Sequence, residues 1–193
     1  MKFDDGTAMR LYRQTVEDFG LYSGKELTEE ELKNLKVSAG QMSAKMRAVR
    51  IVSATSVSKR DLEHRLVQKG EKKADAMEAV AWMTELNLLD DQKTAESIVH
   101  RCIVKGYGLA RAKQALYEKR IPKEYWSDAL ADYPDQTGKI LEFLQSRLGS
   151  SWEEKDLRRA TDALLRRGHS YQEIRKALQE FSENVDFQEE FYG

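Results

Sequence analysis

One short motif occurs three times in this chain, and its spacing constrains the fold more than any other feature. The copies are Leu62-x3-Leu66-x2-Lys69-Gly70, Ala112-x3-Leu116-x2-Lys119-Arg120 and Ala160-x3-Leu164-x2-Arg167-Gly168, so a leucine recurs in the second apolar position, at 66, 116 and 164. Two apolar residues four apart lie on one face of an α-helix, and a glycine after a basic residue is typical of a helix end. Recurrence at this period predicts a tandem helical repeat.

Each copy of the motif is flanked by two further helical segments. Apolar residues stand six and ten positions after each stop: Ala76 and Val80, Trp126 and Leu130, Ile174 and Leu178. An apolar-periodic segment also precedes each copy. We therefore predict an all-α fold of three tandem three-helix repeats in an elongated, curved array. The repeats are placed at 41–90, 91–134 and 135–181, and each needs a neighbour to bury its apolar stripes.

The two ends of the chain differ from the repeats. The N-terminal extension, 1–40, has aromatic and β-branched residues without a helical period at 9–16, which is compatible with a strand or hairpin and also with a frayed end. Thr28 and Glu31 have the spacing of a capping box, which predicts a short helix that ends before Gly40. The tail, 182–193, is acidic and is expected to fray.

Composition argues against several classes of protein. Hydrophobic residues make up 40% and charged residues 34% of the 193, which suits a soluble helical protein with narrow apolar stripes. The N-terminus has no secretory signal, and no segment approaches the roughly 20 apolar residues of a membrane span. A single cysteine, Cys102, fits a reducing compartment. We therefore expect a cytoplasmic protein.

Catalytic and cofactor chemistry finds no support in the sequence. There is no Gly-x4-Gly-Lys phosphate loop. His64, His100 and His169 lie on different repeats, and one cysteine gives no zinc pattern. Cys102 falls on the same apolar stripe as Ile98, which indicates a buried, inert thiol. We predict a protein that is not an enzyme and that carries no metal or cofactor.

The aromatic residues give weaker indications. Tyr107, between two glycines, is either exposed for stacking or folded back on its own repeat, and the second arrangement is the commoner one. Trp82 and Trp126 are predicted to pack in the core. Trp152 follows Gly149-Ser150-Ser151 and serves either as a surface anchor or as a packing staple at a helix start.

Positive charge is concentrated in the central repeat. Between Ser97 and Lys123 seven basic residues stand against one acidic residue, in a chain whose net charge is −1. The candidate partner- or nucleic-acid-binding residues here are Arg101, Lys105, Arg111, Lys113, Lys119 and Arg120. A solvated helix face is the ordinary alternative, but the scarcity of acidic residues four positions away favours a contact surface. A second candidate set, Arg158, Arg159, Arg166 and Arg167, lies near Asp156 and Asp162 and is either a mixed-charge face or a contact.

Three segments resemble a known family. Residues 20–32, GLYSGKELTEEEL, resemble the N-terminal segment of RecX proteins of the Gram-positive type, and 166–174, RRGHSYQEI, resemble their closing repeat. Residues 86–91, LNLLDD, with Lys105-Gly106 and the ending at Ile121, are similar to the central repeat. The resemblance implies a regulator that lies along the groove of the RecA recombinase filament on DNA. Such a protein modulates the ATPase, strand-exchange and coprotease activities of RecA in homologous recombination, DNA repair and the SOS response. Inhibition is the expected direction, although the residues themselves do not decide it.

The chain departs from the family pattern at two places. Residues 54–58 read ATSVS where an Arg-x-Arg-Ser run is usual, and the central repeat ends Lys119-Arg120-Ile121 where Lys-Gly-Ile is usual. Both changes alter exposed charge more than fold. The alternative function is direct DNA binding without a recombinase partner, since each unit has the size of a helix-turn-helix module. The near-zero net charge and the acidic tail favour only weak or accessory DNA contact. We expect a monomer without a membrane partner.

Overall fold

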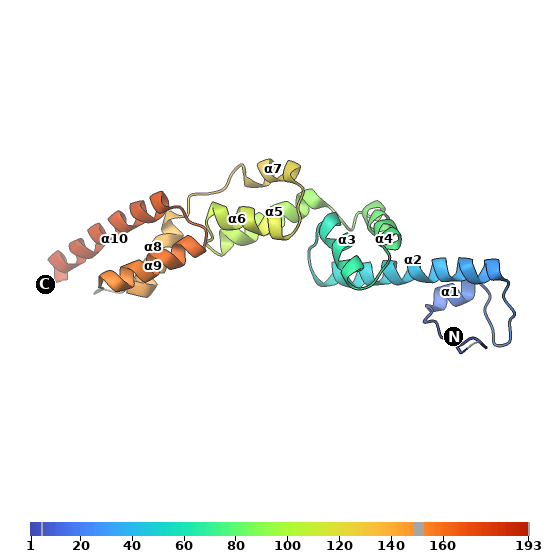
Figure 1. Cartoon of the computed structure of the whole chain (residues 1–193). Helices are drawn as coiled ribbons and strands as arrows, with labels where there is room; N and C mark the ends of the chain where they lie inside the picture. The colour runs from blue at the N-terminus through green and yellow to red at the C-terminus, as the bar shows by residue number, and fades with distance from the viewer. Residues whose placement is uncertain (5, 149–152, 193) are drawn as a thin grey trace. The chain divides into compact units, whose positions relative to one another are not determined.

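Helices are the regular elements of the computed structural model, which describes residues 1–4, 6–148 and 153–192, with side chains as far as residue 182. Ten α-helices and one 3₁₀ helix follow one another in this part of the chain (Figure 1), so the predicted all-α class is confirmed. The chain divides into two compact units, Met1–Asp91 and Gln92–Gly193.

The first unit is organised around a long helix. Its elements are α1 (Arg13–Asp18), α2 (Glu29–Ala54), α3 (Lys59–Gln68) and α4 (Lys73–Glu85). α2 packs against α3 and α4, with Leu62, Leu66 and Met83 fully buried in the core between them. The predicted capping box of Thr28 begins α2, and the Ser58 hydroxyl caps α3. Local capping signals therefore fix where both helices start.

The helix that starts at Glu29 does not end before Gly40, so that prediction was wrong. α2 continues without interruption to Ala54. A Cβ at Gly40 would lie 2.7 Å from Oδ2 of Asp75 on α4, so the glycine lies inside α2 against the Asp75 side chain and does not mark a helix end. The sequence signal was misread because a glycine after a short periodic segment more often marks a terminus.

The N-terminal extension has no strand at the predicted position. The second half of 9–16 belongs to α1, so the strand prediction was wrong there. A single antiparallel bridge joins Lys2 to Ala8 instead, and the N–H of Phe3 donates to the carbonyl of Thr7 at 2.9 Å. The hairpin-like element of the extension therefore lies before the segment that the sequence pattern indicated.

The second unit contains the other two repeats. Its elements are α5 (Asp91–Val104), α6 (Leu109–Glu118), η1 (Lys123–Tyr125), α7 (Trp126–Leu130), α8 (Thr137–Leu148), α9 (Glu154–Arg166) and α10 (Tyr171–Tyr192). Two apolar cores form, one around Ile98 and Leu116 and one around Leu144, Leu164 and Ile174. The backbone of the acidic tail continues α10 as far as Tyr192.

All three motif copies end in the same backbone geometry. Gly70, Arg120 and Gly168 have φ values of 90°, 55° and 87°, in the left-handed region. In each copy the following N–H donates to the carbonyl of the buried leucine, at 3.1, 3.0 and 3.2 Å in chain order. This is the helix C-terminal motif that the spacing predicted, and the repeat is confirmed. The exact repeat ranges stay predictions, since α2 runs through residue 40 and α10 through residue 181.

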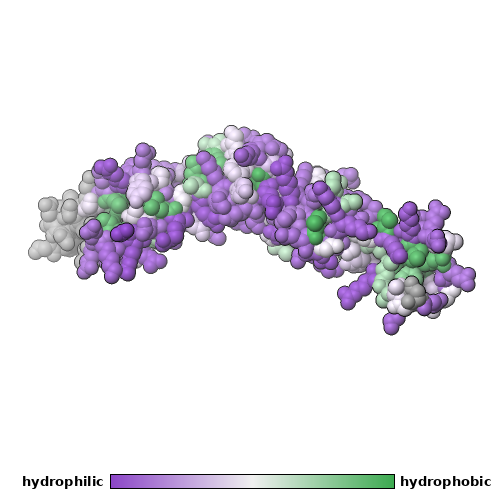
Figure 2. Space-filling model, in the orientation of Figure 1, coloured by the Kyte–Doolittle hydropathy of each residue, from purple (hydrophilic) through white to green (hydrophobic). Residues whose placement is uncertain are grey.

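Apolar side chains are mostly confined to the interior. Figure 2 shows a face on which hydrophilic residues predominate and hydrophobic residues form small, separate groups. In the part of the chain that the structure describes, no helix has both the length and the apolar character needed to cross a bilayer. The outer faces of the helices therefore carry the charged residues on which any polar contact surface depends.

Candidate partner-binding surface

α5 and the residue that follows it present the first two basic side chains of the central repeat. The inner face of this helix is buried, and Ile98 and Cys102 belong to it. Arg101 and Lys105 lie outside this stripe and are exposed. Arg101 Nε donates to the carbonyl of Ser97 at 3.3 Å, which holds the guanidinium along the helix surface. The helical period thus separates the packing residues from the charged ones.

α6 presents the next two basic side chains. Arg111 Nη1 pairs with Glu118 Oε1 at 3.0 Å, and Gln114 donates to the same oxygen at 3.2 Å. These hydrogen bonds lower the pKa of Glu118. The single acidic residue of the basic stretch is therefore already paired. Lys113 is exposed, and in the described chain neither its ammonium group nor that of Lys105 has a hydrogen bond or ion pair.

The end of α6 carries the last two residues of the first predicted set. Lys119 is half-buried, and Arg120 is exposed in the left-handed conformation. Tyr117 beside them has 68% of its surface exposed. The six predicted residues of this repeat thus extend from the middle of α5 to the end of α6, and they do not converge on one point.

A backbone contact joins the second repeat to the third within this unit. The N–H of Gly108 donates to the carbonyl of Arg167 at 3.0 Å, and that of Ala110 to the carbonyl of Gly168 at 3.3 Å. A Cβ at Gly108 would lie 2.0 Å from the Gly168 oxygen, and a Cβ at Gly168 would lie 2.3 Å from the Arg111 nitrogen. Only glycine permits so close an approach at both positions.

His169 completes this junction. The side chain is 4% exposed, and its Nε2 lies 3.0 Å from the carbonyl oxygen of Gly106. A carbonyl can only accept, so Nε2 carries the proton of the neutral ring. Nδ1 is buried and has no hydrogen-bond partner in the described part of the chain. Burial lowers the pKa of His169, against the opposing effect of the Gly106 hydrogen bond.

A shallow hollow on the junction gathers cations from both repeats. Its volume is about 370 Å³, and its lining includes Lys105 after α5, Lys139 and Phe143 from α8, and Arg167 after α9. The Arg167 guanidinium lies over the Phe143 ring, 4.5 Å from its centroid. Such stacking holds the guanidinium in place by cation–π attraction. Of the predicted residues, the structure therefore brings Lys105 and Arg167 together.

Two basic residues near the hollow were missed by sequence reasoning. Lys139, Phe143 and Arg147 are spaced four apart on α8 and share one face of the helix. Arg147 lies 5.7 Å from the Phe143 centroid, and Lys139 pairs with Glu142 at 2.8 Å. The four-residue spacing was a usable signal, but it is less prominent in the sequence than the apolar stripe of the same segment.

The other arginines of the second predicted set lie along α9. Arg158, Arg159 and Arg166 are exposed, and none of them lines the hollow. Arg159 stands 3.7 Å from the Asp156 carboxylate, with both side chains well exposed to solvent. Exposed pairs of this kind hold their partners weakly. A contact role for these three arginines stays a prediction.

The other singled-out side chains of this unit are packing residues. Tyr107 is half-buried, and its backbone carbonyl accepts a hydrogen bond from the Tyr133 hydroxyl at 2.6 Å. Burial raises the pKa of Tyr133 to about 12. Cys102 is buried, and desolvation raises the pKa of its thiol. Trp126 packs against the core of its repeat, while Trp152 lies outside the described residues. Within the described ranges no set of three potential ligands could hold a metal ion.

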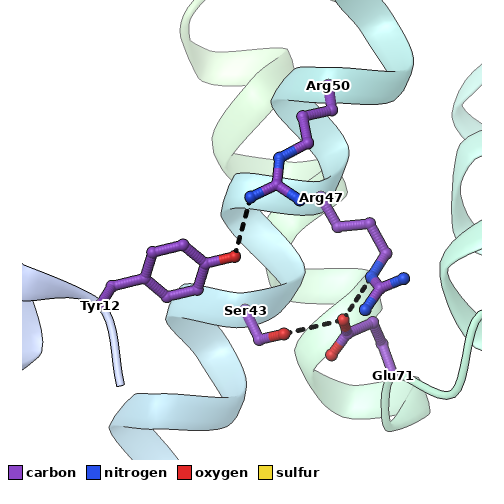
Figure 3. Close-up of polar contacts among 5 residues, drawn as sticks. All are labelled: Tyr12, Ser43, Arg47, Arg50 and Glu71. Carbon is purple, nitrogen blue, oxygen red and sulfur yellow. Dashed lines mark hydrogen bonds and ion pairs between the residues drawn. The ribbon is translucent and has the colours of Figure 1, made fainter. Parts of the chain in front are cut away.

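A second polar cluster, in the first unit, was not predicted. Ser43, Arg47 and Arg50 share one face of α2 (Figure 3). Ser43 Oγ and Arg47 Nε donate to Glu71 Oε1 at 2.9 and 2.7 Å, and Arg50 Nη2 donates to the Tyr12 hydroxyl at 3.2 Å. Tyr12 and Glu71 lie far from α2 in sequence, so only the folded chain reveals the cluster.

Comparison with known proteins finds relatives of this chain. Residues 90–130 match the model of the second three-helix domain of RecX. The regulatory protein RecX of Vibrio parahaemolyticus is 28% identical over 146 residues, which are 74% of this chain and 94% of that protein. The chain is thus similar to RecX proteins over most of its length. The regulatory protein RecX of Streptococcus sanguinis is 24% identical over 196 residues, covering 98% of this chain and 76% of its own.

Solved structures show that the fold itself is the RecX fold. A crystal structure of regulatory protein RecX superposes with a TM-score of 0.66 at 18% identity, covering 92% of each chain. The crystal structure of RecX from Lactobacillus salivarius gives a TM-score of 0.61 at 23% identity, over 75% of this chain and 98% of that one. The resemblance noted in the sequence is therefore confirmed.

Proposed function

We propose that this protein binds the RecA recombinase filament on DNA and inhibits its ATPase, strand-exchange and coprotease activities in recombination and DNA repair. It acts as a cytoplasmic monomer and performs no catalysis of its own. Similarity to a family of regulatory proteins supports this reading, because that family implies RecA as the partner. Binding along the filament groove then blocks access of DNA or alters filament growth.

The observation that carries the proposal is the arrangement of cations on the second unit. Lys105 directly after α5 and Lys113 on α6 are exposed and have no ion pair in the described part of the chain. The backbone contact between Gly108 and Arg167 fixes Arg167, directly after α9, relative to them. A tandem repeat with fixed basic side chains offers an extended contact surface, which suits a filament better than a small pocket does.

The test is the rate of ATP hydrolysis by RecA on single-stranded DNA at sub-stoichiometric ratios of this protein. The informative variant is Lys105→Glu with Lys113→Glu, since both side chains are exposed and unpaired among the described residues. Arg111 is a poorer choice because it pairs with Glu118. The matched control is Lys33→Glu with Lys36→Glu, which makes the same change of charge at exposed positions of α2.

We expect the wild type and the control to slow ATP turnover, and the Lys105/Lys113 variant to lose most of that effect while its helix content stays unchanged. The proposal fails if the wild type neither binds RecA filaments nor changes turnover at any ratio. Normal regulation by the Lys105/Lys113 variant would instead remove the central basic surface from the contact.

Direct DNA binding is the second candidate, and the hollow at the repeat junction is the observation that favours it. Lys105, Lys139 and Arg167 line one side-chain cluster there, and guanidinium and ammonium groups are the usual partners of backbone phosphates. Co-sedimentation with RecA–DNA filaments and with naked DNA across a salt series separates the two functions. Direct binding weakens steeply with salt because each neutralised phosphate releases counterions.

A further inference from the structure

A cavity in the first unit lies between the N-terminal extension and α2. Its volume is about 540 Å³, within the range of small-molecule sites, and its polar lining comes from Arg10, Tyr12, Ser43, Arg47 and Arg50. Residues 10 and 12 precede α1, whereas 43, 47 and 50 lie on one face of α2 (Figure 3). Two segments distant in sequence therefore supply side chains to one cavity.

The positive charge of this lining is only partly compensated. Arg10, Arg47 and Arg50 line the cavity, and no carboxylate is among its described lining residues. Glu71 lies next to it and pairs with Arg47 at 2.7 Å. Arg10 and Arg50 have no ion pair in the described ranges of the chain. A net positive charge remains at a partly enclosed position, where an anion would be attracted.

The hydrogen-bond donors of the cavity are already oriented. The Glu71 carboxylate fixes Arg47 through Nε, which leaves its two terminal nitrogens for another acceptor. Arg50 uses one nitrogen on the Tyr12 hydroxyl oxygen. That hydroxyl accepts from Arg50, so its own hydrogen is available to donate. The two guanidinium groups and the Tyr12 hydroxyl therefore offer more hydrogen-bond donors than a carboxylate, which has only two oxygen atoms, would use.

We propose that this cavity binds a phosphate group. A phosphate has three or more oxygen acceptors, and the planar guanidinium fork matches it with two parallel hydrogen bonds. Arg50 from α2 and Tyr12 from the extension donate to the group, whereas Arg10 and Arg47, whose side chain turns towards Glu71 (Figure 3), add positive charge. The phosphate comes either from a free phosphate or nucleotide or from the backbone of a nucleic acid. This proposal is independent of the RecA partner, because every residue involved lies in the first unit.

The experiment is a calorimetric titration of the full chain with inorganic phosphate, at an ionic strength held constant with sodium chloride. Wild type should bind saturably. Arg10→Gln with Arg50→Gln should weaken binding at least tenfold, since two charge-assisted contacts are lost, and Tyr12→Phe should weaken it about threefold. Arg13→Gln is the matched control, because Arg13 is exposed, pairs with Glu17 and does not line the cavity. Circular dichroism confirms that each variant keeps its helix content.

Two further titrations identify the source and the selectivity. A short single-stranded oligonucleotide that binds wild type more tightly than inorganic phosphate, and that loses this advantage in the Arg10/Arg50 variant, assigns the site to a nucleic-acid backbone. An oligonucleotide with no such advantage assigns it to free phosphate or a nucleotide. Acetate binding as tightly as phosphate overturns the proposal, as does absence of saturable phosphate binding or an equal loss in Arg13→Gln.

Discussion

Replacing Gly108 with alanine should separate the second repeat from the third. The new Cβ would lie 2.0 Å from the Gly168 carbonyl oxygen, whereas ordinary contact begins at 3.4 Å, so the two backbones would have to move apart by about 1.4 Å. That movement breaks two backbone hydrogen bonds, Gly108 to Arg167 and Ala110 to Gly168, and pulls His169 from the Gly106 carbonyl. At about 1 kcal/mol for each hydrogen bond, the junction loses about 3 kcal/mol.

Hydrogen–deuterium exchange of the full chain measures this loss locally, without requiring the two units to unfold together. A decrease of about 3 kcal/mol corresponds to exchange roughly 100-fold faster at the amides of Gly108 and Ala110. Gly138→Ala is the control, since a Cβ there meets nothing within 4 Å and alanine is the better helix former. Unchanged protection in Gly108→Ala would refute the reasoning, because it would mean that the junction tolerates a side chain.

Three other substitutions test the local physics. Arg120→Gly should stabilise the second unit by about 0.5–1 kcal/mol in urea unfolding, because glycine adopts the left-handed conformation without strain, and an unchanged midpoint would contradict this. Burial lowers the pKa of His169 in the folded chain. The stability that the neutral ring contributes is therefore complete above the ordinary pKa of about 6.5 and declines as the pH falls below it. His169→Gln should accordingly reduce the difference between the urea midpoints measured at pH 7.5 and pH 5.5. Arg47→Met should lower the free energy of unfolding by about 1–2 kcal/mol, because the Glu71 carboxylate loses the cation with which it pairs. A decrease no greater than that caused by Arg50→Met would show that this pair does not stabilise the fold.

The features that sequence predicted correctly are those decided within a few residues. The motif places two apolar residues one helical turn apart and a left-handed stop directly after them, and both depend on local geometry. The same holds for Thr28 with Glu31, whose reciprocal capping bonds are present. Because these signals repeat along the chain, the architecture could be derived without any knowledge of long-range contacts.

The features that sequence missed depend on residues far apart in the chain. Gly40 was taken for a helix end because the residue that it lies against, Asp75, belongs to another helix. Gly168 was predicted to end a helix, and nothing in the sequence shows that it touches Gly108. Lys139 lies at the candidate surface because Gly106 has no side chain to keep it away. A Cβ at Gly106 would lie 3.1 Å from the Cβ of Lys139.

The glycine contact also bears on how the basic surface would bind. Lys105 lies before it in sequence and Arg167 beside it, and the contact holds both at one hollow of the same unit. A partner that engages both side chains therefore does not have to order two repeats against each other, and less of the interaction energy is lost to conformational entropy. Gly108→Ala should consequently weaken binding of RecA filaments even though it removes no charge. The Lys105/Lys113 variant should weaken binding while leaving exchange at Gly108 unchanged. If both variants instead altered exchange and binding in parallel, the charges would be acting through the fold and not as contacts.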